Sequence, residues 1–144
     1  MTSDQAGHLY VNIGTAPGRL VLIDARTLAP KAAWPLKECA NPAGLAFDEI
    51  NHRLFSVCAN QIMAVTDSVS GKSIARVVIG RGPDGAAFDA DLSLVFSCNA
   101  ATHKIYLAAA QFGPPPLPTA GAEQPLPHAG VMPDSFVILL AQPK

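Results

Sequence analysis

Seven polar residues lie singly between apolar segments and are the candidates for binding a ligand. They are Glu38, Asn41, Asn60, Arg81, Asp84, Asn99 and His103. Four of them, Glu38, Asn60, Asp84 and Asn99, could supply the oxygen ligands that a calcium ion prefers. Because the same residue types are common in solvated turns, we expect no catalytic group, no bound metal and no cofactor among them.

The cysteines and histidines form no motif that is typical of a reactive centre. Cys39, Cys58 and Cys98 are odd in number and widely spaced, which predicts small buried side chains and argues against a disulfide framework or a zinc site. The four histidines are scattered, and GxSxG, P-loop and GxGxxG motifs do not occur. We therefore expect that the chain is not an enzyme.

The chain contains an internal repeat. The segment Asn41–Asp48 (NPAGLAFD) matches Gly82–Asp89 (GPDGAAFD) at a separation of 41 residues. A second match, at a separation of 43 residues, joins Val21–Asp24 to Ala64–Asp67. Each of these segments ends in an aspartate, and because every copy supplies one, we expect these carboxylates to cap turns and not to catalyse a reaction.

Short apolar segments separated by Gly, Pro, Asn and Asp predict strands joined by tight turns. Four strands in about 40 to 45 residues is the arrangement of a β-propeller blade. The sequence thus predicts an all-β fold of about three four-stranded antiparallel blades, the first incomplete, in one partial domain with blades near 8–36, 42–79 and 83–141. The eleven expected strands are Leu9–Ile13, Arg19–Ala25, Lys31–Leu36, Ala43–Asp48, Arg53–Cys58, Gln61–Asp67, Ser73–Ile79, Gly85–Ala90, Leu92–Cys98, Lys104–Gln111 and Ser135–Ala141.

A proline-rich segment interrupts the third repeat. Residues 113–133 hold seven prolines and one charged residue. Because proline cannot donate to a strand ladder, we expect a long exposed loop within a hairpin. The PxxP spacing from Pro115 to Pro118 leaves an SH3-type ligand open as the alternative.

Composition excludes several classes of protein. The hydrophobic content of 49% is high enough to build a core. The net charge of −1, without a basic run, argues against a nucleic-acid binder. The longest apolar stretches, such as Phe136–Ala141, are much shorter than a membrane-spanning helix. No signal peptide is visible, so residues alone leave the localisation unknown.

Several short motifs together resemble the YVTN/YncE-like family of propeller repeats. They are Leu9-Tyr-Val-Asn12, Leu22-Ile-Asp24, Pro42-Ala-Gly-Leu-Ala-Phe-Asp48 and Arg53-Leu-Phe55. The resemblance implies a periplasmic or secreted protein, usually seven-bladed, without an established catalytic activity. Relatives are linked to scaffold roles, to nucleic-acid binding and to lactone hydrolysis. We therefore expect a non-enzymatic binding or scaffold module, and the alternatives are a lactonase-like metal-dependent hydrolase and a truncated propeller remnant.

Three blades are too few to close a propeller, because known rings need at least about four. An isolated chain would expose the apolar faces of its first and last blades, and large exposed apolar patches mark interfaces. We therefore expect a homodimer, or assembly with another propeller-completing chain.

Overall fold

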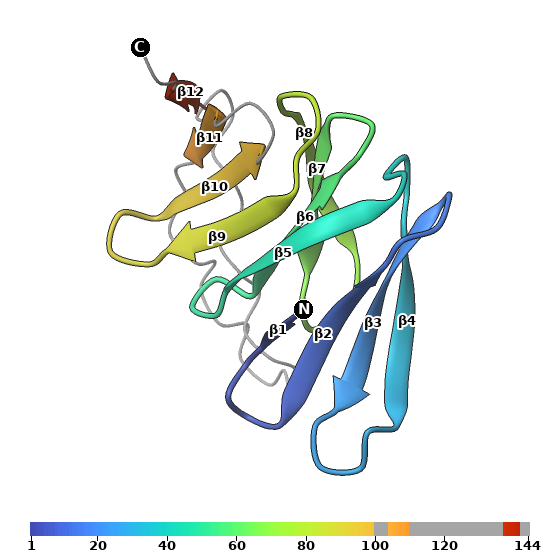
Figure 1. The fold of residues 1–144 in the computed structure, drawn as a ribbon. Helices are drawn as coiled ribbons and strands as arrows, with labels where there is room; N and C mark the ends of the chain where they lie inside the picture. The colour runs from blue at the N-terminus through green and yellow to red at the C-terminus, as the bar shows by residue number, and fades with distance from the viewer. Residues whose placement is uncertain (100–103, 110–136, 142–144) are drawn as a thin grey trace, which may run out of the picture.

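The computed structural model describes residues 1–99, 104–109 and 137–141, and this part of the chain contains twelve strands and no helix (Figure 1). The strands form three four-stranded antiparallel sheets, which confirms the predicted all-β fold built from propeller blades. The first sheet contains β1 (Thr2–Ser3), β2 (His8–Ile13), β3 (Gly18–Asp24) and β4 (Pro30–Leu36). The second contains β5 (Pro42–Asp48), β6 (Arg53–Cys58), β7 (Ile62–Asp67) and β8 (Ser73–Val78). The third contains β9 (Gly85–Asp89), β10 (Leu94–Asn99), β11 (Lys104–Ala109) and β12 (Val137–Ala141).

All eleven predicted strands are present, with ends that differ from the prediction by at most two residues. The prediction that the first sheet lacks an innermost strand is wrong, because Thr2 and Ser3 pair with Tyr10 and Leu9. This strand is short, so the sequence offers no apolar run that would reveal it. The proline-rich segment at 113–133 lies outside the described residues, as does His103.

The three sheets follow one another like the blades of a fan, with the second between the first and the third (Figure 1). Glycine permits their innermost strands to approach closely. A Cβ atom added at Gly44 of β5 would lie 2.5 Å from the amide nitrogen of Ala86 in β9. That distance is far below any real contact, so only glycine fits where these two strands meet.

Apolar side chains fill the space between neighbouring sheets in two clusters. The first cluster joins the first and second sheets and includes Tyr10, Leu20, Leu36, Leu45 and Leu54. The second cluster joins the second and third sheets and includes Ala46, Phe55, Val57, Met63 and Val95. Because both faces of the middle sheet are covered, its strands are apolar on both sides and do not alternate with polar residues.

Aromatic pairs repeat from one interface to the next. The rings of Tyr10 and Phe47 lie 5.4 Å apart between the first two sheets. The rings of Phe55 and Phe88 lie 5.9 Å apart at the equivalent place between the second and third sheets. Phe47 and Phe88 therefore occupy matching positions between blades, as the repeat predicts.

A half-buried polar contact at the first interface has no counterpart at the second among the residues that the structure describes. Asn12 of β2 donates to the carbonyl of Gly44 at 3.1 Å and accepts a hydrogen bond from the Ser56 hydroxyl at 2.9 Å. The repeat places Ser97 at the position of Ser56, but Val57 replaces Asn12. The fully buried Ser97 hydroxyl has no hydrogen-bond partner within the described part of the chain.

Candidate functional site

The predicted ligand-binding residues gather at one end of the sheets. The linker 37–41 joins β4 to β5, and the linker 79–84 joins β8 to β9. Because β5 and β9 lie side by side and begin at the same end, the two linkers lie at that end too. The first linker carries Glu38 and Asn41, and the second carries Arg81 and Asp84. Asn60 lies in the β6–β7 hairpin and Asn99 ends β10, at the same end of each sheet.

Two asparagine side chains hold the linkers in place. The Asn60 side-chain oxygen accepts a hydrogen bond from the Ala40 amide at 3.0 Å, and its NH₂ group donates to the Glu38 carbonyl at 2.7 Å. In the next sheet, the Asn99 NH₂ group donates to the Arg81 carbonyl. The structure thus brings Glu38 close to Asn60, and Arg81 close to Asn99, in one cluster for each linker. In both clusters, the amide group bonds to the main chain of the linker.

The remaining predicted residues take part through their main chains. The Asn41 amide donates to the Thr15 carbonyl at 3.1 Å, and the Asp84 amide donates to the Cys98 carbonyl at 2.9 Å. Within the residues that the structure describes, no group of three or more His, Cys, Asp and Glu side chains is placed to hold a metal ion.

A disulfide bond joins Cys39 to Cys58, so the prediction of unpaired cysteines is wrong for these two residues. The bond ties the linker 37–41 to the end of β6, and both cysteines are buried. The repeat places Cys58 at the position of Asn99, which holds the next linker by a hydrogen bond. The two linkers are therefore fastened to the second strand of the following sheet at the same place, once covalently and once by an amide. Cys98 is a free, exposed thiol.

The opposite end of the second sheet contains a buried arginine between aspartates. Arg53 is 4% exposed, and its Nη1 lies 3.4 Å from Oδ2 of Asp67. Burial lowers the pKa of Arg53, while the charges of Asp67 and Asp48 oppose that shift. The carboxylate of Asp48 also accepts hydrogen bonds from the main chain and side chain of Asn51, at 3.1 and 2.8 Å.

The other repeated aspartates also cap turns. Asp24 accepts from the amides of Arg26 and Thr27 at 3.0 and 2.9 Å, and Asp89 accepts from the amides of Asp91 and Leu92 at 3.0 and 3.1 Å. Asp67 does the same for the Val69 and Ser70 amides. Their predicted role in the turns is confirmed.

The first sheet has a histidine where the second has Arg53. The His8 Nδ1 atom lies 2.6 Å from Oδ2 of Asp4, and its Nε2 atom lies 3.2 Å from the Lys31 ammonium. Because an ammonium group can only donate, Nε2 accepts, and Nδ1 donates its proton to Asp4. Burial would raise the pKa of Asp4, but hydrogen bonds from His8 and from the Ala6 amide outweigh it and lower the pKa. Asp4 matches Asp48 in the repeat, and from this match the end of a strand at β1 could have been predicted.

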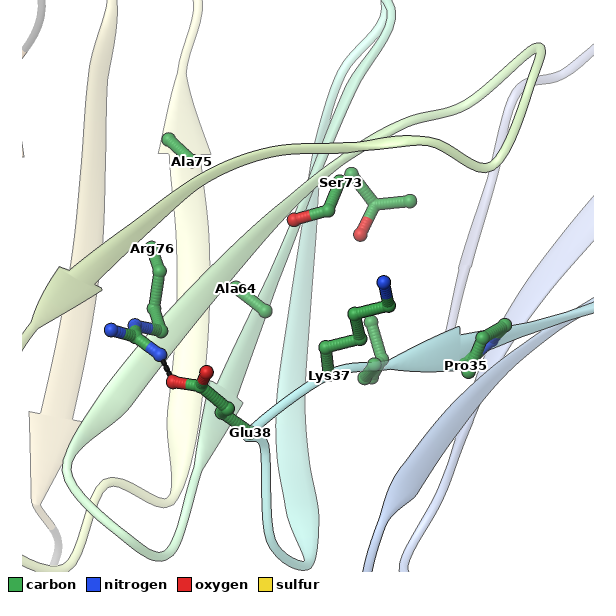
Figure 2. Close-up of a pocket in the computed structure, with 9 residues that line it drawn as sticks. Pro35, Lys37, Glu38, Ala64, Ser73, Ala75 and Arg76 are labelled. Carbon is green, nitrogen blue, oxygen red and sulfur yellow. Dashed lines mark ion pairs between the residues drawn. The ribbon is translucent and has the colours of Figure 1, made fainter.

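Two cavities open between the first and second sheets. One, of about 320 Å³, lies at the end that carries Asp4 and His8 and is also lined by His52 and Ser68. The other, of about 310 Å³, lies between β4 and the strands β7 and β8, beside the linker 37–41 (Figure 2). Of the residues that line the second cavity, sequence analysis singled out Glu38 alone as a candidate. Lys37 lies beside Glu38 in the linker, and the others belong to strands or their last residues, with no local signal for binding.

Comparison with known proteins shows the fold and not a family. No protein-family model matches the chain, and no curated protein matches its sequence. Solved structures that resemble it include Kuenenia stuttgartiensis hydrazine synthase, with a TM-score of 0.64, 16% identity and coverage of 74% of this chain and 30% of that chain. The β-propeller domain of Myceliophteria thermophila Cps50 (Swd1) gives 0.60 and 15%, covering 76% and 34%. The WD40 repeats of RRP9 give 0.61 and 9%, covering 74% and 33%.

The last two of these neighbours are β-propeller and WD40 domains, and sequence identities this low show the fold alone. The chain spans about a third of the length of each, between 30% and 34%. It therefore corresponds to a sector of a propeller, in agreement with its three sheets.

Proposed function

We propose that this chain is a non-enzymatic propeller segment that acts as a binding or scaffold module and is completed by a second copy of itself. The observation that carries the proposal is that both end sheets present an apolar face that no described sheet covers. The equivalent faces of the middle sheet are buried between blades.

The open face of the first sheet consists of aliphatic side chains on β2 and β3. Tyr10 and Leu20 point to the second sheet, so the alternate residues of the same strands point the other way. These are Leu9, Val11, Val21 and Ile23, all of them half-buried. The matching residues of the second sheet, Leu54, Ser56, Ala64 and Thr66, are at most 6% exposed. This difference in exposure supports the proposal that a preceding blade covers the open face of the first sheet.

The open face of the third sheet also carries apolar side chains. Phe96 is half-buried, and Ala87 and Cys98 are exposed. Their equivalents in the second sheet are Phe55, Ala46 and Val57, which are at most 4% exposed against the third sheet. Because one chain carries both halves of a blade-to-blade interface, two copies could place each third sheet against the partner's first sheet and close a six-bladed ring.

The resemblance to YVTN/YncE-like repeats and a periplasmic or secreted location are parts of the same proposal. The Cys39–Cys58 disulfide supports the location, because such bonds persist mainly in oxidising compartments. The motifs quoted for the resemblance also form the strands β2, β3, β5 and β6, which is where a propeller repeat would need them.

The end of the sheets that carries the two linkers is the surface we propose for a further binding partner. Glu38, Arg81 and Asp84 are exposed there. Loops held by a rigid scaffold are common binding surfaces, and both linkers are fastened to the sheets behind them.

The test is the mass of the purified protein in solution, measured by light scattering coupled to size-exclusion chromatography. A homodimer should give about twice the chain mass of 15.0 kDa. Val21→Lys places a charge on the open face of the first sheet and should reduce the mass to that of one chain. The control is Val78→Lys, because Val78 lies on the outer strand β8 and is 69% exposed, so this variant should keep the mass of the unaltered protein. A stable monomer at micromolar concentration would contradict the proposal, while a mixed complex would point to another propeller-completing chain and aggregation to a remnant.

A further inference from the structure

The cavity beside the linker 37–41 is lined mainly by polar and charged groups from three parts of the chain. The end of β4 supplies Pro35 and Leu36, and the linker supplies Lys37 and Glu38. The strands β7 and β8 supply Ala64, Thr66, Ser73, Ala75 and Arg76. At about 310 Å³, the cavity has the size of a small-molecule site.

Two hydroxyl groups and one ammonium group are available in this cavity. Thr66 is 3% exposed, and its side chain lines the cavity. Ser73 is its cross-strand partner in the register of β7 and β8, so the two hydroxyls belong to one face. Lys37 extends from the linker into the cavity toward Ser73 (Figure 2).

The charge of the lining favours an anion. Lys37 and Arg76 are cationic and Glu38 is anionic, which leaves one net positive charge. Glu38 forms an ion pair with Arg76, so the uncompensated cation is Lys37 (Figure 2). Hydroxyl groups that line a cavity can donate hydrogen bonds to the oxygens of a bound anion, and hydrogen bonds to an ionised acceptor are stronger than neutral ones.

We infer that this cavity binds the anionic oxygens of a small molecule, a carboxylate or a phosphate group, through Lys37 and the hydroxyls of Thr66 and Ser73. The inference stands apart from the proposed assembly, because every residue involved belongs to one chain and to the interface between its first two sheets. The carboxylate of Glu38 already occupies Arg76, which limits the site to a compact ligand.

The experiment is a titration of the ¹⁵N-labelled full chain, followed by the amide NMR signals of Thr66, Ser73 and Lys37. Inorganic phosphate and acetate are added in separate arms at constant ionic strength and pH, and the arm with the tighter saturation identifies the preferred group. We expect saturable shifts with a dissociation constant on the order of 1 to 10 mM, as befits a few polar contacts. Thr66→Val should weaken binding about tenfold, and so should Lys37→Gln.

Two further variants make the titration decisive. Ser73→Ala removes an exposed hydroxyl that the fold does not need, so it tests the site even where Thr66→Val fails to fold. Lys31→Gln is the control, because Lys31 is an exposed lysine on the strand β4, which precedes the linker of Lys37, and it does not line the cavity. The inference is overturned by linear shifts without saturation up to about 50 mM, or by equal affinity in the Lys37→Gln and Lys31→Gln variants.

Discussion

Removal of the Cys39–Cys58 disulfide should destabilise the protein by about 3 kcal/mol. The bond closes a loop of 19 residues, and the loss of loop-closure entropy in the unfolded chain predicts about that value for a loop of this size. The double variant Cys39→Ala/Cys58→Ala removes the bond without leaving a polar group in the buried site. Cys98→Ala is the matched control, because this thiol is free and exposed.

The assay is urea unfolding at equilibrium, followed by fluorescence of the single tryptophan, Trp34. With a slope of about 2 kcal/mol per molar urea, a loss of 3 kcal/mol lowers the midpoint by about 1.5 M. The Cys98→Ala control should unfold within about 0.3 M of the unaltered protein. A reductant should lower the midpoint of the unaltered protein and leave that of the double variant unchanged.

A midpoint for the double variant within about 0.3 M of the control would refute the reasoning. It would mean that the linker is held at the end of β6 by its hydrogen bonds alone. In that case the Asn60 amide, which bonds to Ala40 and Glu38, would be the group that fixes the linker.

Three further predictions concern the polar contacts between sheets, the Asp4–His8 pair of the first sheet, and the aromatic contact of Phe88. Ser56→Ala should cost about 1 to 2 kcal/mol of unfolding free energy, because it leaves the Asn12 side-chain oxygen without its donor. Ser97→Ala removes a hydroxyl that has no partner among the described residues and should be neutral or stabilising, so equal losses in the two variants would refute this. Asp4→Asn should flatten the acid dependence of stability, measured by urea unfolding between about pH 5 and pH 2. The lowered pKa of Asp4 makes its carboxylate stabilising above the ordinary aspartate pKa of about 3.9, and this stabilisation is lost as the pH falls through the pKa of the folded state. An unchanged slope would exclude the contact between Asp4 and His8. Phe88→Ala should cost about 2 kcal/mol in the same assay, less than a fully buried phenylalanine, and a loss below about 0.5 kcal/mol would remove Phe88 from the interface.

The sequence was sufficient to predict every described strand except β1, because each blade repeats one local pattern of apolar residues and turn residues. The match of Phe47 to Phe88 also placed both rings between blades, as observed. In such a fold each unit meets only its neighbours, so a local repeat carries most of the long-range packing.

The parts that sequence reasoning missed depend on contacts that the repeat does not encode. The disulfide forms because the linker of one blade lies across the second strand of the next, which brings Cys39 within reach of Cys58. The cavity beside Lys37 arises from the spacing of two sheets and not from any motif. The short β1 carries no apolar run, although Asp4 marks its end in the register of Asp48.

The repeat equivalences show that the two interfaces are fastened unequally. The first has the disulfide, the two hydrogen bonds of Asn60 and the contact between Asn12 and Ser56. The second has the hydrogen bond from the Asn99 amide to the Arg81 carbonyl at the place of the disulfide, and within the described residues the Ser97 hydroxyl has no partner. Among the described residues the third sheet thus has fewer ties to its neighbour, and its far face, like the open face of the first sheet, is covered by no described sheet. If a second chain covers that face, as we propose, its binding stabilises the third sheet against local opening.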